Sequence, residues 1–180
     1  AEIQCYGANT FATILRGGEG VLYKEVLINA CNKMKVNFNK NASVEIIEMN
    51  LLMKILTDSM EKMTPEELQT LVEELDLKTT NFTKQAVVAA IQAGIKVGGF
   101  AAYKVAVIVA NAVAKAVIGR GLSLAVGAGL TRSMAILAGP IGWAITALWT
   151  LLDIAGPAFR ITMPCVVQVA FLRAKLKYKG

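Results

Sequence analysis

The sequence predicts an all-α protein, in which an acidic amphipathic helical subdomain (residues 1–80) is followed by a basic, Gly/Ala-rich hydrophobic helical half (residues 81–180). The two parts form either separate units or one continuous domain. Apolar residues recur at helical spacing, helix-start signals precede them, and no alternating strand pattern occurs. Residues 1–76 carry 7 Lys/Arg and 12 Asp/Glu, whereas residues 77–180 carry 12 Lys/Arg and one Asp/Glu. Such asymmetry indicates that the basic half meets an anionic partner.

The first part of the acidic half predicts two helices. After the Gly17-Gly18 break, a spacing of four predicts a helix over about 20–36, with an apolar face of Leu22, Val26, Ala30 and Met34. Ser43 is a suitable cap for a second helix, and Glu45 is favourable in its first turn. One apolar face of this second helix consists of Val44, Ile47, Leu51, Ile55 and Leu56.

The segment "TPEEL" is a strong start signal for a third helix. Thr64 can cap this helix, and Glu67 completes a capping box. Pro65 suits the first helical position, where its missing N–H costs nothing. We expect the helix to end at about Leu77. Its acidic side chains are expected to form a solvated face: Glu66, Glu67, Glu73, Glu74 and Asp76.

The second half is dominated by Ala, Val, Gly and Ile, and single cations interrupt its apolar runs. At about 100° per residue, Lys104, Asn111 and Lys115 form a narrow polar stripe on an otherwise apolar helix. Such a helix is typical of one buried in protein or lying against lipid. A last helix is expected to follow Pro164, and its end carries Arg173, Lys175, Lys177 and Lys179.

Residues 133–152 form a run of twenty without a charged side chain, which raises the question of a membrane span. Two pairs of residues are expected to break the helices here: Gly139-Pro140 and Gly156-Pro157. The helix between them, about 141–155, would be about 22 Å long, shorter than a hydrocarbon core of about 30 Å. We therefore expect a packed helix in which Trp143 and Leu148 are buried.

The composition excludes several chemistries. There is no histidine, which excludes serine–histidine and cysteine–histidine catalysis and removes the commonest metal ligand. Cys5, Cys31 and Cys165 are far apart and form no CxxC pair, which argues against a zinc site or a redox dithiol. We therefore expect reduced thiols, no metal, no cofactor and no enzyme activity.

Cations and tryptophans of the second half are the candidate contacts with a membrane or a partner. They are Lys104, Lys115, Arg132, Trp143, Trp149, Arg173, Lys175, Lys177 and Lys179. Basic residues attract anionic headgroups by about 1 kcal/mol each near the surface, although the same residues also suit a solvated helix end. Asp153 is the only acid of this half, so it needs a partner. Arg160 is a candidate, giving a structural or gating ion pair.

Two stretches of the chain resemble the bacterial YaaW-like family: "ANTFATILRGGEGVLYKEVLINACNKMKV" and "LTRSMAILAGPIGWAITALWTLLDIAGPAFRITMPCVVQVAFLR". The segment from Gly139 to Ala158 is the most specific part, and the resemblance extends more loosely across nearly the whole chain. It implies an intracellular bacterial helical protein, with a link to a ubiquinol-cytochrome c chaperone-like domain. Family members carry a further N-terminal module, so we expect Ala1 to lie within a longer protein. The family supplies no catalytic residues to transfer.

Two functions agree with these observations. The first is a membrane-active helical module, which inserts into or permeabilises an anionic bilayer through its apolar C-terminal half and can oligomerise there. The alternative is a soluble chaperone-like or protein-interaction module that buries the apolar helices in its core. The expected partner is an anionic membrane or a protein, not nucleic acid, because the cations are scattered and not interleaved with stacking aromatics. The expected location is the bacterial cytoplasm or the surface of the inner membrane.

Overall fold

The computed structural model of the chain describes residues 22–121 and 157–179. Within these ranges the secondary structure consists of six α-helices and one short 3-10 helix without any strand, which confirms the predicted all-α fold. The predicted helix over 141–155 and its Trp143 and Leu148 lie outside the described residues, as does the break at Gly139-Pro140.

Three α-helices form the described part of the acidic half. They are α3 (Tyr23–Lys33), α4 (Val44–Ser59) and α5 (Pro65–Leu75), with the 3-10 helix η1 (Met60–Lys62) after α4. The Thr64 hydroxyl accepts a hydrogen bond from the Glu67 amide, and the Glu67 carboxylate accepts one from the Thr64 amide, so the predicted capping box is confirmed. Asp76 ends α5 in the left-handed conformation, with φ of 54°. Ser43 occupies the N-cap position of α4, but its side chain makes no capping hydrogen bond.

Three further helices form the described part of the basic half: α6 (Lys84–Val97), α7 (Gly99–Gly121) and α10 (Pro157–Lys179). Thr83 caps α6, because its hydroxyl accepts a hydrogen bond from the Ala86 amide. Gly94 brings α6 close to α7, since a Cβ at this position would lie 3.2 Å from the Cβ of Ala101. The chain therefore turns from α6 into α7 with the two helices in close contact.

The last helix differs from the sequence-based expectation. It was expected to follow Pro164, but α10 begins at Pro157 and continues through Pro164. A proline inside a helix costs about 3 kcal/mol through one lost hydrogen bond and a steric clash. Burial of a large apolar side chain contributes about 1.5–3 kcal/mol, and α10 buries Met163, Val166 and Val167 around the proline. Packing on both sides of Pro164 therefore outweighs the local cost.

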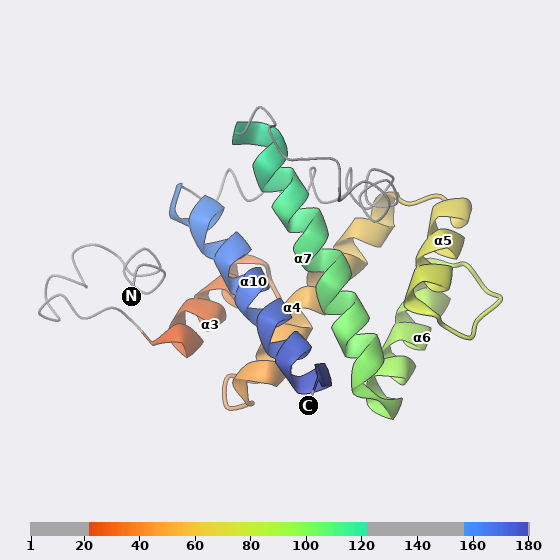
Figure 1. Cartoon of the computed structure of the whole chain (residues 1–180), viewed down its shortest axis with the longest axis horizontal. Helices are drawn as coiled ribbons and strands as arrows, with labels where there is room; N and C mark the ends of the chain where they lie inside the picture. The colour runs from red at the N-terminus through yellow and green to blue at the C-terminus, as the bar shows by residue number, and fades with distance from the viewer. Residues whose placement is uncertain (1–21, 122–156, 180) are drawn as a thin grey trace, which may run out of the picture.

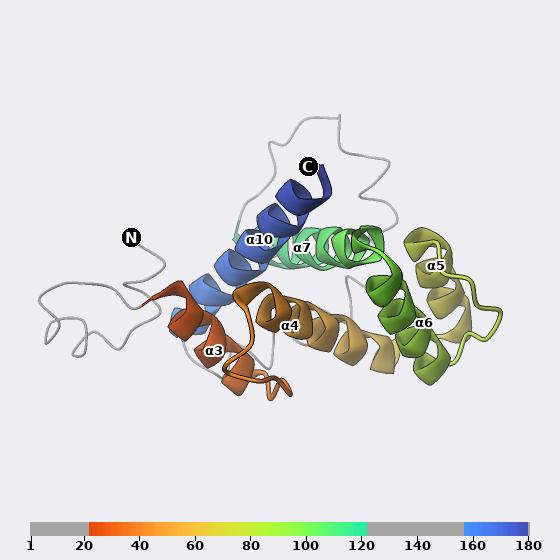
Figure 2. The same cartoon turned by 90° about the horizontal axis from the view of Figure 1, so that it is seen from below.

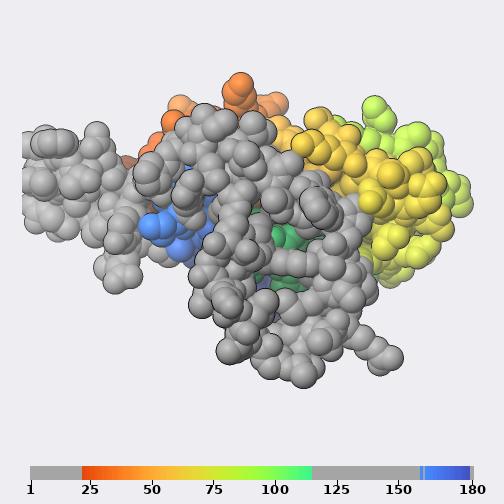
Figure 3. Space-filling view, turned by 90° about the horizontal axis from the view of Figure 1, so that it is seen from above, coloured from red at the N-terminus to blue at the C-terminus, as the bar shows by residue number. Residues whose placement is uncertain are grey.

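The helices are arranged around α7 and α10, which lie side by side and run antiparallel (Figure 1). Helix α4 packs against both of them, α3 packs against α4 and α10, and α5 and α6 lie together at the other end of α4 (Figure 2). In the space-filling view, the orange to yellow surface from α3 to α5 runs along one side of the molecule (Figure 3). No helix within the described ranges combines the length and the hydrophobicity needed to cross a membrane.

Side chains of both halves share one hydrophobic core. The acidic half contributes buried side chains such as Leu27, Ile47, Leu51, Leu52 and Ile55, and the basic half contributes Ile91, Val105, Val109, Val113, Met163 and Val167. The acidic helices and the described basic helices are therefore packed against each other through apolar contacts.

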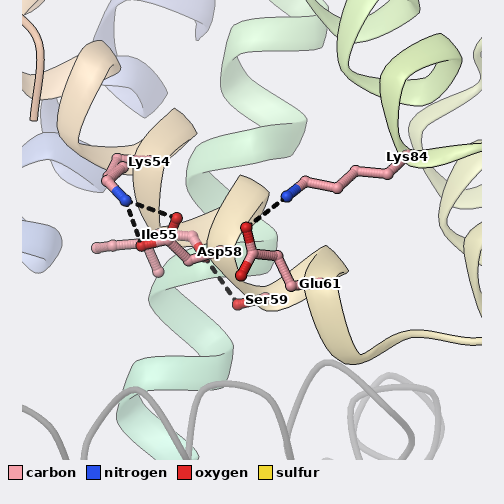
Figure 4. A network of polar contacts seen from close by, with 6 residues as sticks. All are labelled: Lys54, Ile55, Asp58, Ser59, Glu61 and Lys84. Carbon is pink, nitrogen blue, oxygen red and sulfur yellow. Dashed lines mark hydrogen bonds and ion pairs between the residues drawn. The ribbon is translucent and has the colours of Figure 1, made fainter.

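Polar contacts also join the two halves at the end of α4 (Figure 4). The Lys84 ammonium at the start of α6 lies 2.6 Å from a carboxylate oxygen of Glu61 in η1. Within α4, Lys54 pairs with Asp58 one helical turn later, at 2.7 Å, which does not link the halves. Both pairs are partly exposed, and such pairs typically contribute no more than about 1 kcal/mol. The apolar core is therefore the main source of cohesion.

The shared core predicts that an α10 side chain stabilises the whole described fold. We expect Met163→Ala to lower the free energy of unfolding by about 2–5 kcal/mol, as is typical for a large buried side chain. Leu172→Ala is the matched control, because Leu172 lies on the same helix but is exposed, and we expect a change within about 0.5 kcal/mol. Urea unfolding followed by circular dichroism measures both. A separate transition for α10, or equal effects of the two substitutions, would contradict a shared core.

Candidate functional site

Four aromatic rings gather where the start of α7 meets the end of α10. Phe100 and Tyr103 are three residues apart on α7, and Phe171 and Tyr178 are seven residues apart on α10, so each pair shares one helix face. Because the two helices run antiparallel, the start of one lies beside the end of the other (Figure 1). We call these four rings the aromatic ladder.

The rings of the aromatic ladder contact one another in sequence. Phe100 and Tyr178 have centroids 5.1 Å apart, Tyr178 and Tyr103 stack at 5.1 Å with planes 5° apart, and Tyr103 and Phe171 stack at 6.4 Å. These separations lie in the range of favourable ring pairs. Phe100 is 42% exposed and Tyr178 is 50% exposed. The ladder is thus internally packed but keeps a substantial apolar surface in water.

A lysine lies over a ring at each end of the aromatic ladder. The Lys104 ammonium is 4.5 Å from the centroid of Phe100, and the Lys175 ammonium is 6.0 Å from the centroid of Phe171. Both distances are within the range of cation–π attraction. The structure therefore brings two of the predicted contact residues, Lys104 and Lys175, to one surface.

Exposed aliphatic side chains lie next to the aromatic ladder along the chain. Val97 directly precedes the α6–α7 turn and is 89% exposed, and Leu172 and Leu176 are exposed one turn apart on α10. On a helical wheel, Leu172 and Leu176 lie about 100–160° from Phe171 and Tyr178, so they occupy a different face of α10 from the rings.

Arg173 lies on a third face of α10 and contacts α4. The Arg173 Nε atom lies 3.0 Å from Glu48 Oε2, and Arg173 Nη1 lies 3.4 Å from Glu45 Oε1. The Tyr23 hydroxyl donates a 2.7 Å hydrogen bond to Glu48 Oε1. We call Tyr23, Glu48 and Arg173 the Glu48 cluster. The Nε contact is close but poorly aligned, so it is an ion pair rather than a hydrogen bond. The cluster joins α3, α4 and α10.

Burial dominates the electrostatics of the Glu48 cluster. The Glu48 side chain is 4% exposed, and this desolvation raises its pKa, although the Tyr23 hydroxyl and the Arg173 guanidinium act in the opposite direction. Burial and the neighbouring carboxylate raise the pKa of Tyr23 far above its usual range. Burial raises the pKa of the nearby Cys31 thiol to about 12, so the thiol is protonated at neutral pH. The Glu48 cluster is therefore suited to holding α3, α4 and α10 together.

The other residues that were predicted to contact a membrane or partner, or to break a helix, lie elsewhere in the chain. Lys177 is exposed at the end of α10, where its charge helps to lower the pKa of Glu45, mainly held low by backbone hydrogen bonding. Lys115, Arg160 and Lys179 lie on helices, Arg160 in the first turn of α10 that Pro157 begins. The other predicted residues lie outside the described residues: Arg132, Gly139, Pro140, Trp143, Trp149, Asp153 and Gly156. The proposed Asp153–Arg160 pair therefore stays a prediction.

Sequence reasoning did not identify the aromatic ladder. The spacings of Phe100 with Tyr103 and of Phe171 with Tyr178 could have indicated two aromatic helix faces. No local pattern indicates that these faces meet, because the contact depends on the antiparallel packing of α7 and α10. Glu48 was also missed, since its partners Tyr23 and Arg173 are distant in the sequence.

Comparison with known proteins places the chain among bacterial relatives. A family model described as Ubiquinol-cytochrome C chaperone matches residues 1–168. A UPF0174 protein of Helicobacter pylori strain J99 is 53% identical over 175 residues, covering 97% of the chain and 69% of that relative. A second UPF0174 protein of that strain is 44% identical over 181 residues, covering 98% of the chain and 86% of the relative.

A more distant relative is the UPF0174 protein YaaW of Escherichia coli K12, 27% identical over 175 residues that cover 96% of the chain and 68% of that protein. These matches confirm the resemblance to the YaaW-like family. No solved structure matches the chain.

The Glu48 cluster predicts an asymmetric response to substitution. Removing Arg173 leaves a buried carboxylate without its cation, whereas removing the charge of Glu48 leaves a half-exposed cation. We expect Arg173→Met to lower the free energy of unfolding at pH 7 by about 2–3 kcal/mol, and Glu48→Gln by less than about 1 kcal/mol. Lys177→Met, on the exposed face of the same helix, is the control and should change it by less than about 0.5 kcal/mol.

The loss in free energy of unfolding caused by Arg173→Met, called the deficit below, should also depend on pH. Because the pKa of Glu48 lies above its ordinary value of 4.5 in the folded protein, ionisation of Glu48 reduces stability as the pH rises through the folded pKa. The deficit should be largest at pH 7 and should shrink as the pH falls toward 4.5. Urea unfolding across this range measures it. A deficit independent of pH, or a larger loss for Glu48→Gln, would show that the buried charge is not the cause.

Proposed function

The chain belongs to the Ubiquinol-cytochrome C chaperone family, and we propose that it is a non-catalytic protein-binding module with a chaperone-like role. In this proposal, the surface around the aromatic ladder holds an apolar segment of a partner protein. The aromatic ladder is the single observation that carries the proposal, because Phe100 and Tyr178 expose apolar surface in a packed, ordered arrangement.

The chemistry of this surface is that of a protein interface. Tyrosine and phenylalanine are enriched in interfaces, where a few aromatic side chains often carry most of the binding energy. Val97 at the end of α6, and Leu172 and Leu176 on another face of α10, expose further apolar side chains close to the ladder in the sequence. Lys104 and Lys175 supply a charged rim without interrupting the rings. A partner segment would thus find an apolar centre with a polar edge.

The support beneath the surface favours a preformed site. The helices that carry the rings, α7 and α10, also bury Val105, Val109, Val167 and Ala170 in the shared core. Side chains on rigid helices lose less conformational entropy when a partner binds. The described part of the chain therefore needs no large rearrangement to present the ladder.

The membrane-permeabilising function expected from the sequence involves the apolar C-terminal half (residues 81–180), of which residues 122–156 lie outside the described part of the chain. The apolar segments that are described, in α6 and α7, pack against the acidic helices α4 and α5. Nothing in the described residues supports permeabilisation, so the protein-binding function is the better-supported proposal. Location at an inner-membrane surface stays a prediction.

Binding to defined peptides tests the proposal. The probe is a panel of labelled amphipathic helical peptides with Leu and Phe on one face and Gln on the other, followed by fluorescence anisotropy. We expect binding in the micromolar to sub-millimolar range, on the order of 5–8 kcal/mol. The double substitution Phe100→Ser with Tyr178→Ser should weaken it at least about tenfold, as is typical of interface aromatics.

The matched control is Leu22→Ser, which removes an exposed apolar side chain at the start of α3 and should leave peptide binding unchanged. A dye-release assay with anionic vesicles runs in parallel, and we expect no release. If no peptide binds, or if the ladder variant binds as tightly as the wild type while the protein releases dye, the protein-binding proposal is wrong and the membrane-active function is favoured.

A further inference from the structure

The two chain segments that carry the aromatic ladder are strongly basic. Residues 96–104 and 171–179 carry six Lys/Arg and no Asp/Glu. Arg173 forms ion pairs with Glu45 and Glu48 of α4. The charge of Lys177 helps to lower the pKa of Glu45. Among the ion pairs of residues 22–121 and 157–179, none involves Lys104 or Lys175. These two cations contact rings and have no carboxylate partner within the described structure.

The ammonium groups of Lys104 and Lys175 can each form a further ion pair. A lysine ammonium carries three N–H donors, and a ring face at 4.5–6.0 Å occupies only one side of it. Both side chains are partly exposed, so solvent reaches them. A carboxylate that approaches from solvent would pair with the ammonium without displacing it from the ring.

The two cations stand at opposite ends of the ring sequence. Lys104 lies over Phe100, Lys175 lies over Phe171, and Tyr178 and Tyr103 connect these rings in steps of 5.1–6.4 Å. The surface is therefore an apolar centre bracketed by two positive charges. A complementary segment has apolar side chains bracketed by carboxylates. Three such steps correspond to at most about three turns of a partner helix, which rises about 1.5 Å per residue.

We propose that the aromatic ladder, with Lys104 and Lys175, is a docking site for an acidic amphipathic segment of a partner protein. This inference rests on the proposed protein-binding function and specifies the chemistry of its partner. Apolar contact with the exposed faces of Phe100 and Tyr178 supplies affinity, and the two lysines supply orientation and selectivity for negative charge. Basic segments are rejected by the same cations.

The ring geometry favours a protein segment over single-stranded nucleic acid. Bases bind by stacking on free ring faces, whereas Tyr103 is stacked on Phe171 and Tyr178 and those rings stack within the ladder. The exposed apolar residues close to the rings in the sequence, Val97, Leu172 and Leu176, are aliphatic and offer no further ring on which a base could stack. Nucleic acid is accordingly an alternative outcome of the experiment.

The experiment compares three probe peptides that differ only in their polar face. Each is a labelled amphipathic helix of about four turns with the same Leu and Phe face, and its polar positions are Glu, Gln or Lys. We expect the Glu peptide to bind about tenfold more tightly than the Gln peptide at low salt, and the Lys peptide to bind least. The preference for Glu should fall as salt is added.

Lysine variants identify the origin of the preference. Lys104→Gln with Lys175→Gln should remove most of the difference between the Glu and Gln peptides, whereas Lys104→Arg with Lys175→Arg should retain it. The control is Lys35→Gln with Lys40→Gln, two exposed lysines between α3 and α4, which should retain the full preference. Matching melting temperatures of all variants exclude a folding defect.

The outcomes separate the two proposals. If the Glu and Gln peptides bind equally and the double substitution Phe100→Ser with Tyr178→Ser abolishes both, protein binding stands and the acidic partner is wrong. If no peptide binds but labelled oligo(dT) does, and the lysine variants weaken it, both proposals are wrong and the surface binds nucleic acid. If the preference for Glu survives Lys104→Gln with Lys175→Gln, the site lies elsewhere.

Discussion

The packing of α10 across α7 and α4 is the contact on which the rest of the described structure depends. Met163, Val166 and Val167 on α10 are buried against side chains of both halves, and this burial lets the helix pass through Pro164 without ending. The same packing brings Arg173 to Glu48 and places Tyr178 between Phe100 and Tyr103. The core, the Glu48 cluster and the aromatic ladder are thus three consequences of one helix contact.

Charge plays a smaller and more local role than the opposite signs of the two halves suggest. The described ion pairs that join the halves are Lys84 with Glu61 and Arg173 with Glu45 and Glu48. The pairs of Glu61 and Glu45 are partly exposed and contribute little, whereas Glu48 is buried and costly to leave unpaired. Among the described ion pairs none involves Lys104 or Lys175, so these two charges remain available to select an acidic partner.

Local sequence signals predicted most of the described helices. The Thr64-Pro65-Glu67 signal placed the start of α5, and the spacing of Val26 and Ala30 placed α3, because caps and periodicity act within one or two turns. The prediction at Pro164 was wrong because tertiary burial outweighed a local penalty. The site was predicted in part: Lys104 and Lys175 were named, but the rings between them were not, since their meeting requires two helices about seventy residues apart to pack antiparallel.

Hydrogen–deuterium exchange of the full chain, with and without the Glu-bearing probe peptide, tests the central claim most directly, because it locates binding without any substitution. We expect slower exchange in residues 96–104 and 168–178 when the peptide is bound, and unchanged exchange in α5 (Pro65–Leu75), which carries four glutamates and no basic residue. Protection confined to α5, or bound peptide with no protection at the start of α7 and the end of α10, would contradict the assignment of the aromatic ladder as the protein-binding surface.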